Sequence, residues 1–246
     1  MSECPHIPDP VPHLGEPRWP NGLRPELPPL PANIARLPRH RGYPVPWFVD
    51  RTNIAGDPDF RVADGRRFVE AIRKGLCWVC GQSLRRPAAF LVGPMCAVNR
   101  ISAEPPSHIE CAEWSAIGCP FLSRPHMDRR EAGMPEGAVN PGGLMITRNP
   151  GVSILWVTSS FRVVSDPGSR GYLIEMGRPR RVSAYASGRA ATPDEVRASF
   201  ESGLPLLGAV AEEEGEEALA ALARQAEQAS ALLGIARGRR RAVPHG

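Results

Sequence analysis

In the second half of the chain, short apolar runs alternate with turn residues, and this pattern predicts β-strands. The runs are rich in β-branched and aromatic residues, and the segments between them contain Gly and Pro. They cover residues 144–147, 152–164, 172–176 and 182–186. Because the intervening turns are short, we expect neighbouring strands to pair in an antiparallel β-meander over residues 144–190.

The pattern then changes to a helical period, which predicts two helices within residues 191–236. Thr192, Pro193 and Glu195 form the signature of a helix start, with a capping box and a first-turn proline. A second helix is expected over about residues 204–233, weakened midway by Gly215. Its apolar positions recur at heptad-like spacing and would make a homodimer if the helix paired with itself. They are Leu219, Leu222, Ala226, Ala229 and Leu233.

Residues 47–123 predict a smaller unit with both helices and strands. Asp64 is a good cap for a helix that ends before Gly75. The apolar segment 88–92 predicts a strand, and a Gly-Pro turn suggests that residues 97–101 return as a second strand. The chain as a whole is therefore expected to belong to the α+β class, with this unit preceding the meander.

A further helix is expected over residues 108–117. Ser107 and Glu110 have the S-x-x-E spacing of a capping box, and two prolines directly before them exclude helix upstream. This spacing would place His108 at the first helical position and Cys111 three residues later on the same face.

Three segments lack the periodicity of either helix or strand. Residues 1–46 hold 13 of the 28 prolines and predict an extended or disordered arm, although the aromatic stretch 43–49 has enough apolar content to pack over the core. Residues 124–143 predict a linker or loop, and residues 237–246 a basic tail.

The composition is that of a globular protein, with 246 residues, 42% of them hydrophobic and 23% charged. A formal net charge of +4 would suit an acidic partner, but Lys74 is the only lysine, and such an arginine bias is typical of GC-rich coding sequences. The first residues do not have the pattern of a signal peptide, and no apolar run approaches the ~18 residues of a membrane helix. We therefore expect a cytoplasmic protein whose six cysteines are thiols or metal ligands.

Two pairs of residues have the spacing of metal ligands. Cys77 and Cys80 stand in C-W-V-C-G, a turn that directs two sulfurs to one point, and His108 and Cys111 stand in H-I-E-C. Three thiolates and one imidazole are a common donor set for tetrahedral structural zinc. The sequence therefore predicts a Zn²⁺ site, and Cys96 is an alternative ligand that could replace His108.

This arrangement resembles the treble-clef zinc finger over residues 77–117, in which a knuckle, a hairpin and a helix supply the ligands. Some treble clefs are HNH nucleases, which implies a metal-dependent hydrolase as an alternative function. That family carries a catalytic histidine between its ligand pairs, and this chain has none between Gly81 and Ser107. The whole chain also resembles uncharacterised proteins of GC-rich bacteria and their phages, a resemblance that implies no activity.

The function favoured by these residues is that of a non-enzymatic, zinc-stabilised binding protein. Its partner would be nucleic acid or another protein, and no membrane is implicated. Arg85, Arg86 and Arg100 flank the predicted hairpin and could reach phosphates, although they could equally form a solvated rim.

Overall fold

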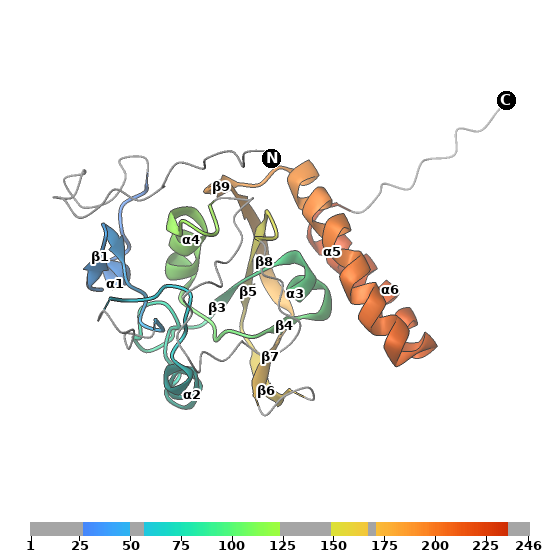
Figure 1. Ribbon diagram of the computed structural model, residues 1–246, viewed down its shortest axis with the longest axis horizontal. Coiled ribbons are helices and arrows are strands. Elements are labelled where there is room, and N and C mark those ends of the chain that lie inside the picture. The colour runs from blue at the N-terminus through green and yellow to red at the C-terminus, as the bar shows by residue number, and fades with distance from the viewer. Residues whose placement is uncertain (1–26, 50–56, 124–148, 167–170, 236–246) are drawn as a thin grey trace, which may run out of the picture.

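The computed structural model describes residues 27–49, 57–123, 149–166 and 171–235, which form a mixed α+β fold (Figure 1). Its helices are α1 (Ala32–Ala35), α2 (Gly65–Lys74), α3 (Pro94–Asn99), α4 (Ile109–Gly118), α5 (Pro193–Glu214) and α6 (Glu216–Leu232). Its strands are β1 (Arg39–His40), β2 (Tyr43–Pro44), β3 (Ala88–Val92), β4 (Ile101–Ser102), β5 (Ser153–Thr158), β6 (Phe161–Ser165), β7 (Tyr172–Met176), β8 (Pro179–Ala186) and β9 (Arg189–Ala190). All the strand pairs are antiparallel.

The central strand is β5, which lies in the sheet of order β3-β5-β8-β9 and is buried along its whole length. Its side chains alternate between the two faces of the sheet, and both sets are buried because both faces are covered. Leu155 and Val157 pack with Ala112 of α4. Ile154 and Trp156 belong to the main core, which α3, α5 and α6 cover on the other side (Figure 1).

A second sheet, of order β4-β7-β6, encloses the same core. Ile174 and Met176 of β7 are almost fully buried in it. Phe161 of β6 meets Phe90 of β3 edge to face, with ring centroids 5.7 Å apart. One hydrophobic core therefore joins strands from both halves of the chain.

The predicted strand over residues 152–164 is wrong as a single element. It is divided at Thr158, whose hydroxyl donates to the carbonyl of Arg178 (2.9 Å) and accepts from the amide of Ser160 (3.3 Å). The first part pairs with β3 and β8 and the second with β7, so the order is not that of a simple meander. The strand predicted at 172–176 is confirmed, 182–186 lies within β8, and 144–147 lies outside the described residues.

The predicted strand over residues 97–101 is also wrong, because most of it is helix. Gly93 precedes the helix and Pro94 takes its first position, where a missing N–H costs no hydrogen bond. Ala97 and Val98 then face the core, and only Ile101–Ser102 is extended, paired with β7. The expected hairpin between the two ligand pairs is therefore not formed.

The start of α5 is confirmed, including the complete capping box of Thr192 and Glu195. The predicted second start near residue 204 is wrong, because α5 continues through Pro205 to Glu214 and the break falls at Gly215. The helix has buried residues on both sides of the proline, Gly203 and Ala211 among them. The apolar stripe of α6 contributes Ala229, Leu222, Ala226 and Leu233 to the core.

The part of the predicted arm that the structure describes, residues 27–46, is not simply extended. It contains one turn of helix, α1, and the short pair β1–β2. Ile34 of α1 is 1% exposed, and Trp47 and Phe48 lie against Trp78, as the aromatic content of 43–49 predicted. Residues 1–26, the predicted linker 124–143 and the basic tail lie outside the described residues, and the predicted domain division stays a prediction. None of the described helices has an apolar stretch long enough to cross a membrane.

Candidate metal centre

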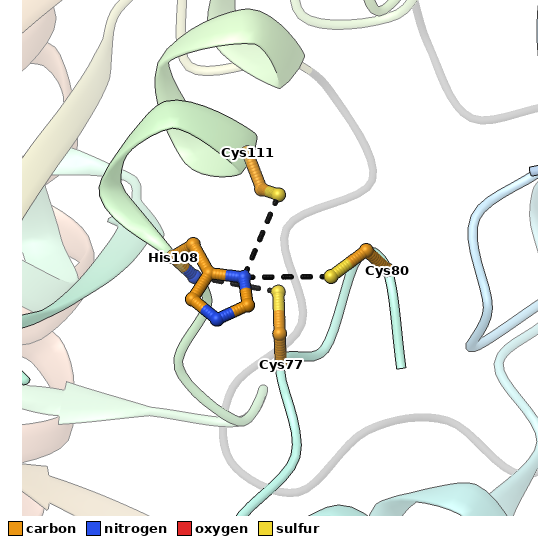
Figure 2. Close-up of side chains that lie close together, drawn as sticks. All are labelled: Cys77, Cys80, His108 and Cys111. Carbon is orange, nitrogen blue, oxygen red and sulfur yellow. Dashed lines mark hydrogen bonds between the residues drawn. The ribbon is translucent and has the colours of Figure 1, made fainter. Parts of the chain in front are cut away.

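The first half of the site is a tight turn that carries Cys77 and Cys80. The amide of Gly81 donates to the carbonyl of Cys77 (2.8 Å), and the amide of Cys77 donates to the carbonyl of Gln82 (2.7 Å). A single β-bridge between Leu76 and Ser83 closes the loop. These bonds hold the backbone so that both sulfurs point to one side of the turn (Figure 2).

Glycine is required at position 81 both by the backbone conformation and by the lack of room for a side chain. Its φ of +71° lies in the left-handed region that favours glycine, and a Cβ atom there would lie 2.5 Å from the Trp47 ring. The amide of Trp47 donates to the carbonyl of Val79 (2.8 Å), so the N-terminal segment packs directly on the cysteine turn.

The second half of the site is the start of α4, which differs by one residue from the prediction. His108 is the N-cap instead of the first helical residue, and the predicted capping box of Ser107 and Glu110 is not formed. Ser107 instead exchanges two backbone hydrogen bonds with Ala89 of β3. Cys111 nevertheless projects from the first turn toward His108 (Figure 2).

The structure brings Cys77, Cys80, His108 and Cys111 together, with their four donor atoms all within 4.8 Å of one another and every residue buried. Nδ1 of His108 lies 3.4 Å from Sγ of Cys80 and 3.8 Å from Sγ of Cys111. A tetrahedral zinc ion with ordinary bond lengths separates a ligating sulfur from a ligating nitrogen by about 3.5 Å. The donor set and its spacing therefore fit such an ion.

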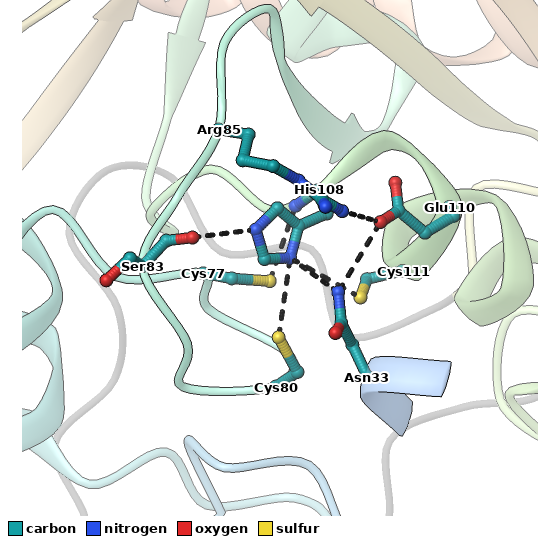
Figure 3. Close-up of polar contacts among 8 residues, drawn as sticks. All are labelled: Asn33, Cys77, Cys80, Ser83, Arg85, His108, Glu110 and Cys111. Carbon is teal, nitrogen blue, oxygen red and sulfur yellow. Dashed lines mark hydrogen bonds and ion pairs between the residues drawn. The ribbon is translucent and has the colours of Figure 1, made fainter. Parts of the chain in front are cut away.

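The hydrogen bond of His108 on its far side identifies which nitrogen faces the sulfurs. Nε2 lies 2.9 Å from the carbonyl oxygen of Ser83, which can only accept, so Nε2 carries the proton (Figure 3). Nδ1 is then left with its lone pair directed at the three cysteines. Metal-bound histidines usually have this arrangement, with the second nitrogen held by a backbone carbonyl or carboxylate.

The three thiols cannot all ionise together without a cation. Hydrogen bonding from Cys111, and then from Cys80, lowers the pKa of Cys77 to about 2. The same contacts with Cys77 and Cys80, followed by burial, raise the pKa of Cys111 far above its ordinary value. A soft divalent cation would remove this conflict, because it stabilises several thiolates at once.

A polar layer and an apolar layer surround the four donors. Nδ2 of Asn33 lies 3.5 Å from Nδ1 of His108 and 3.4 Å from Oε1 of Glu110, which also forms an ion pair with Arg85 (Figure 3). The apolar layer contains Ile34, Val79 and Trp114. The N-terminal segment therefore encloses the site together with the cysteine turn and α4.

Sequence reasoning missed Asn33 and Ser83. Ser83 acts through its backbone carbonyl, which no side-chain pattern reveals. Asn33 lies 44 residues before Cys77 in a segment expected to be extended.

Cys96 lies apart from this cluster. It stands on α3 and packs against the main core, where burial raises the pKa of its thiol. The group of possible metal ligands found among the described residues does not contain it.

The three arginines predicted to reach phosphates have different surroundings. Arg85 pairs with Glu110. Arg86 donates to the carbonyl of Ser159 and lies over the Phe161 ring, 4.8 Å from its centroid. Arg100 is exposed and follows α3. No protein-family model, curated protein or solved structure matches this chain.

Proposed function

We propose that the chain is a non-enzymatic binding protein whose fold is stabilised by one Zn²⁺ ion. The ligands would be Cys77, Cys80 and Cys111 through sulfur and His108 through Nδ1. The observation that carries this proposal is the buried group of four donors, in which two sulfur–nitrogen separations of 3.4 and 3.8 Å are close to those of tetrahedral zinc. Four protein ligands complete such a set, as in structural sites, whereas a catalytic site keeps one position for water.

The treble-clef likeness is part of the proposal. A glycine-containing cysteine turn and the first turn of a helix supply the two ligand pairs, which supports it. The segment between them is built from β3, α3 and β4 in place of a simple hairpin. The nuclease alternative would need a vacant coordination position and a base, and His108 is occupied on both nitrogens by the proposed metal and Ser83.

The ion would connect three parts of the chain that are distant in sequence. The cysteine turn and α4 supply the ligands, while α1 packs over them through Ile34. Binding of structural zinc contributes on the order of 10 kcal/mol to the folding of small zinc modules. Zinc would therefore order residues 76–84 and the start of α4 more than the distant helices α5 and α6.

Metal analysis of the purified protein and of single cysteine variants tests the ligand set. We expect one zinc per chain, lost in Cys77→Ser, Cys80→Ser and Cys111→Ser but retained in Cys96→Ser. Cys96→Ser is the matched control, because it makes the same chemical change at a cysteine outside the cluster. Stoichiometric zinc in the first three variants, or its loss in the control, would contradict the assignment.

Of the two partner classes, we favour protein. Two of the three arginines that could reach phosphates near the cysteine turn already have partners within the fold, Arg85 with Glu110 and Arg86 with Phe161 and Ser159. Fluorescence anisotropy with a labelled random DNA duplex and an RNA hairpin tests this choice. We expect no tight binding at 150 mM salt. Binding that weakens steeply with salt and is reduced in Arg85→Ala and Arg86→Ala would instead identify nucleic acid.

A further inference from the structure

A cavity lies between α3, α6 and the start of β8, and none of the four candidate metal ligands lines it. Its volume is about 470 Å³, within the range of small-molecule sites. Its walls are formed by Ala97, Val98, Arg100, Trp156, Arg178, Pro179, Gln225, Gln228, Ala229, Ala231 and Leu232.

The polar side chains that line this cavity could all hydrogen-bond to an anionic group or to the polar edge of a ligand. Two guanidinium groups, from Arg100 and Arg178, and two amides, from Gln225 and Gln228, line a wall that is otherwise apolar. None of the described residues that line it is Asp or Glu. The fixed charge of the cavity is therefore positive without an internal counter-charge.

Among the described residues, several surface arginines of the fold are neutralised by neighbouring acids, whereas these two are not. Arg162 pairs with Glu175 at 2.5 Å, and Arg181 pairs with Glu113. Within the described part of the chain, neither Arg100 nor Arg178 forms an ion pair. Their guanidinium groups therefore remain available to a ligand.

The backbones of both arginines are held in place. The carbonyl of Arg100 accepts from the amide of Met176 (2.8 Å), and that of Arg178 accepts from the hydroxyl of Thr158 (2.9 Å). Arg100 also has a φ of +56°, at the position after a helix where glycine or asparagine is preferred. A non-glycine residue in this left-handed conformation is unfavourable, and such strained positions occur often at functional sites.

We infer that this cavity binds a small organic anion. A phosphate or carboxylate group lies between Arg100 and Arg178, where each guanidinium can donate two hydrogen bonds. The apolar or planar part of the ligand lies against Val98 and Leu232, and the amides of Gln225 and Gln228 hydrogen-bond to its polar edge. This site is independent of the metal centre and of its proposed role.

The test uses the full-length, zinc-loaded protein and anilinonaphthalene sulfonate, a fluorescent probe that joins an anionic group to an apolar ring system. We expect saturable binding of one probe per chain. The double variant Arg100→Ala/Arg178→Ala should weaken it about tenfold or more, because it removes the charge-assisted hydrogen bonds. The charge-matched control Arg73→Ala/Arg180→Ala changes two exposed arginines outside the cavity and should bind as wild type.

A second variant, Ala231→Phe, fills the cavity without changing its charge. Ala231 is exposed on α6, so the larger side chain should leave folding intact, which far-UV circular dichroism checks, and abolish probe binding. Wild-type affinity in both the double variant and Ala231→Phe would overturn the inference, as would the absence of saturable binding.

Competition then distinguishes the source of the anion. Displacement of the probe by octanoate identifies a carboxylate ligand, and displacement by adenosine monophosphate identifies a phosphate ligand. Either result supports an organic anion. The inference would be contradicted if neither compound displaced the probe. It would also be contradicted if inorganic phosphate displaced the probe as well as adenosine monophosphate does, because the organic part of the ligand would then contribute nothing.

Discussion

Substitution of Gly81 by alanine should destabilise the cysteine turn through two separate effects. The backbone at φ +71° disfavours any residue with a Cβ atom, which costs roughly 1–2 kcal/mol. The added methyl group would also lie 2.5 Å from the Trp47 ring, and such overpacking costs roughly 1–3 kcal/mol. The free energy of unfolding should therefore fall by about 2–5 kcal/mol.

Gly75 provides a matched control for the backbone effect alone. It also has a left-handed conformation, with φ +62°, but a Cβ atom there would meet nothing within 4 Å. Gly75→Ala should therefore cost only about 1–2 kcal/mol. In a Trp47→Ala background the contact is absent, so the penalty of Gly81→Ala should fall to that of Gly75→Ala.

Urea unfolding of the zinc-loaded protein, followed by far-UV circular dichroism, measures these differences without relying on the fluorescence of Trp47. The argument fails if Gly81→Ala and Gly75→Ala are equally destabilising. It fails equally if the penalty at Gly81 is unchanged when Trp47 is removed, because the ring would then not be the source of the extra cost.

Three further predictions follow from other parts of the fold. Hydrogen bonding from the Arg189 side chain, and then from the amide of Thr192, lowers the pKa of Glu195 to about 2, so its stabilising effect is present above its ordinary pKa and lost as pH falls from about 4.5 to about 2. An NMR titration should show this pKa, and Arg189→Ala should raise it; an ordinary value in the wild type would refute the contact. Leu155→Ala at a fully buried position should cost about 3 kcal/mol, whereas Leu206→Ala, at a residue 40% exposed, should change stability by less than about 0.5 kcal/mol. In the zinc-loaded protein, ¹⁵N NMR of His108 should show the proton on Nε2 and none on Nδ1, and the opposite tautomer would contradict the proposed ligation.

Local signals correctly predicted both ends of α2 and the start of α5. Asp64 and Gly75 bound α2 as expected, and Thr192 with Glu195 begins α5, since each of these contacts is made within a few residues. The proximity of the two ligand pairs also followed from spacing, because a cysteine turn and a first helical turn each fix the direction of their side chains.

Tertiary contacts decided the remaining features. A capping box at Ser107 was compatible with the sequence, but Ser107 pairs with β3 and the helix begins one residue later. Residues 97–101 have a composition that suits a strand, yet Pro94 and the burial of Ala97 and Val98 favour helix. The pairing of β5 with β3 and β8 joins residues far apart in the chain, which local periodicity cannot specify.

The pairing of β3 with β5 also affects how the polypeptide matures on the ribosome. Ala88 and Thr158 are partners 70 positions apart, so until translation has passed β5 the edge of β3 that pairs with β5 has no partner strand. A released fragment that contains the four metal ligands but stops before β5 would present the β3 backbone, with Phe90 and Leu91, to solvent. An unpaired strand edge of this kind can pair with other chains and so promote aggregation. The fragment that carries the four metal ligands, when expressed alone, should therefore be insoluble.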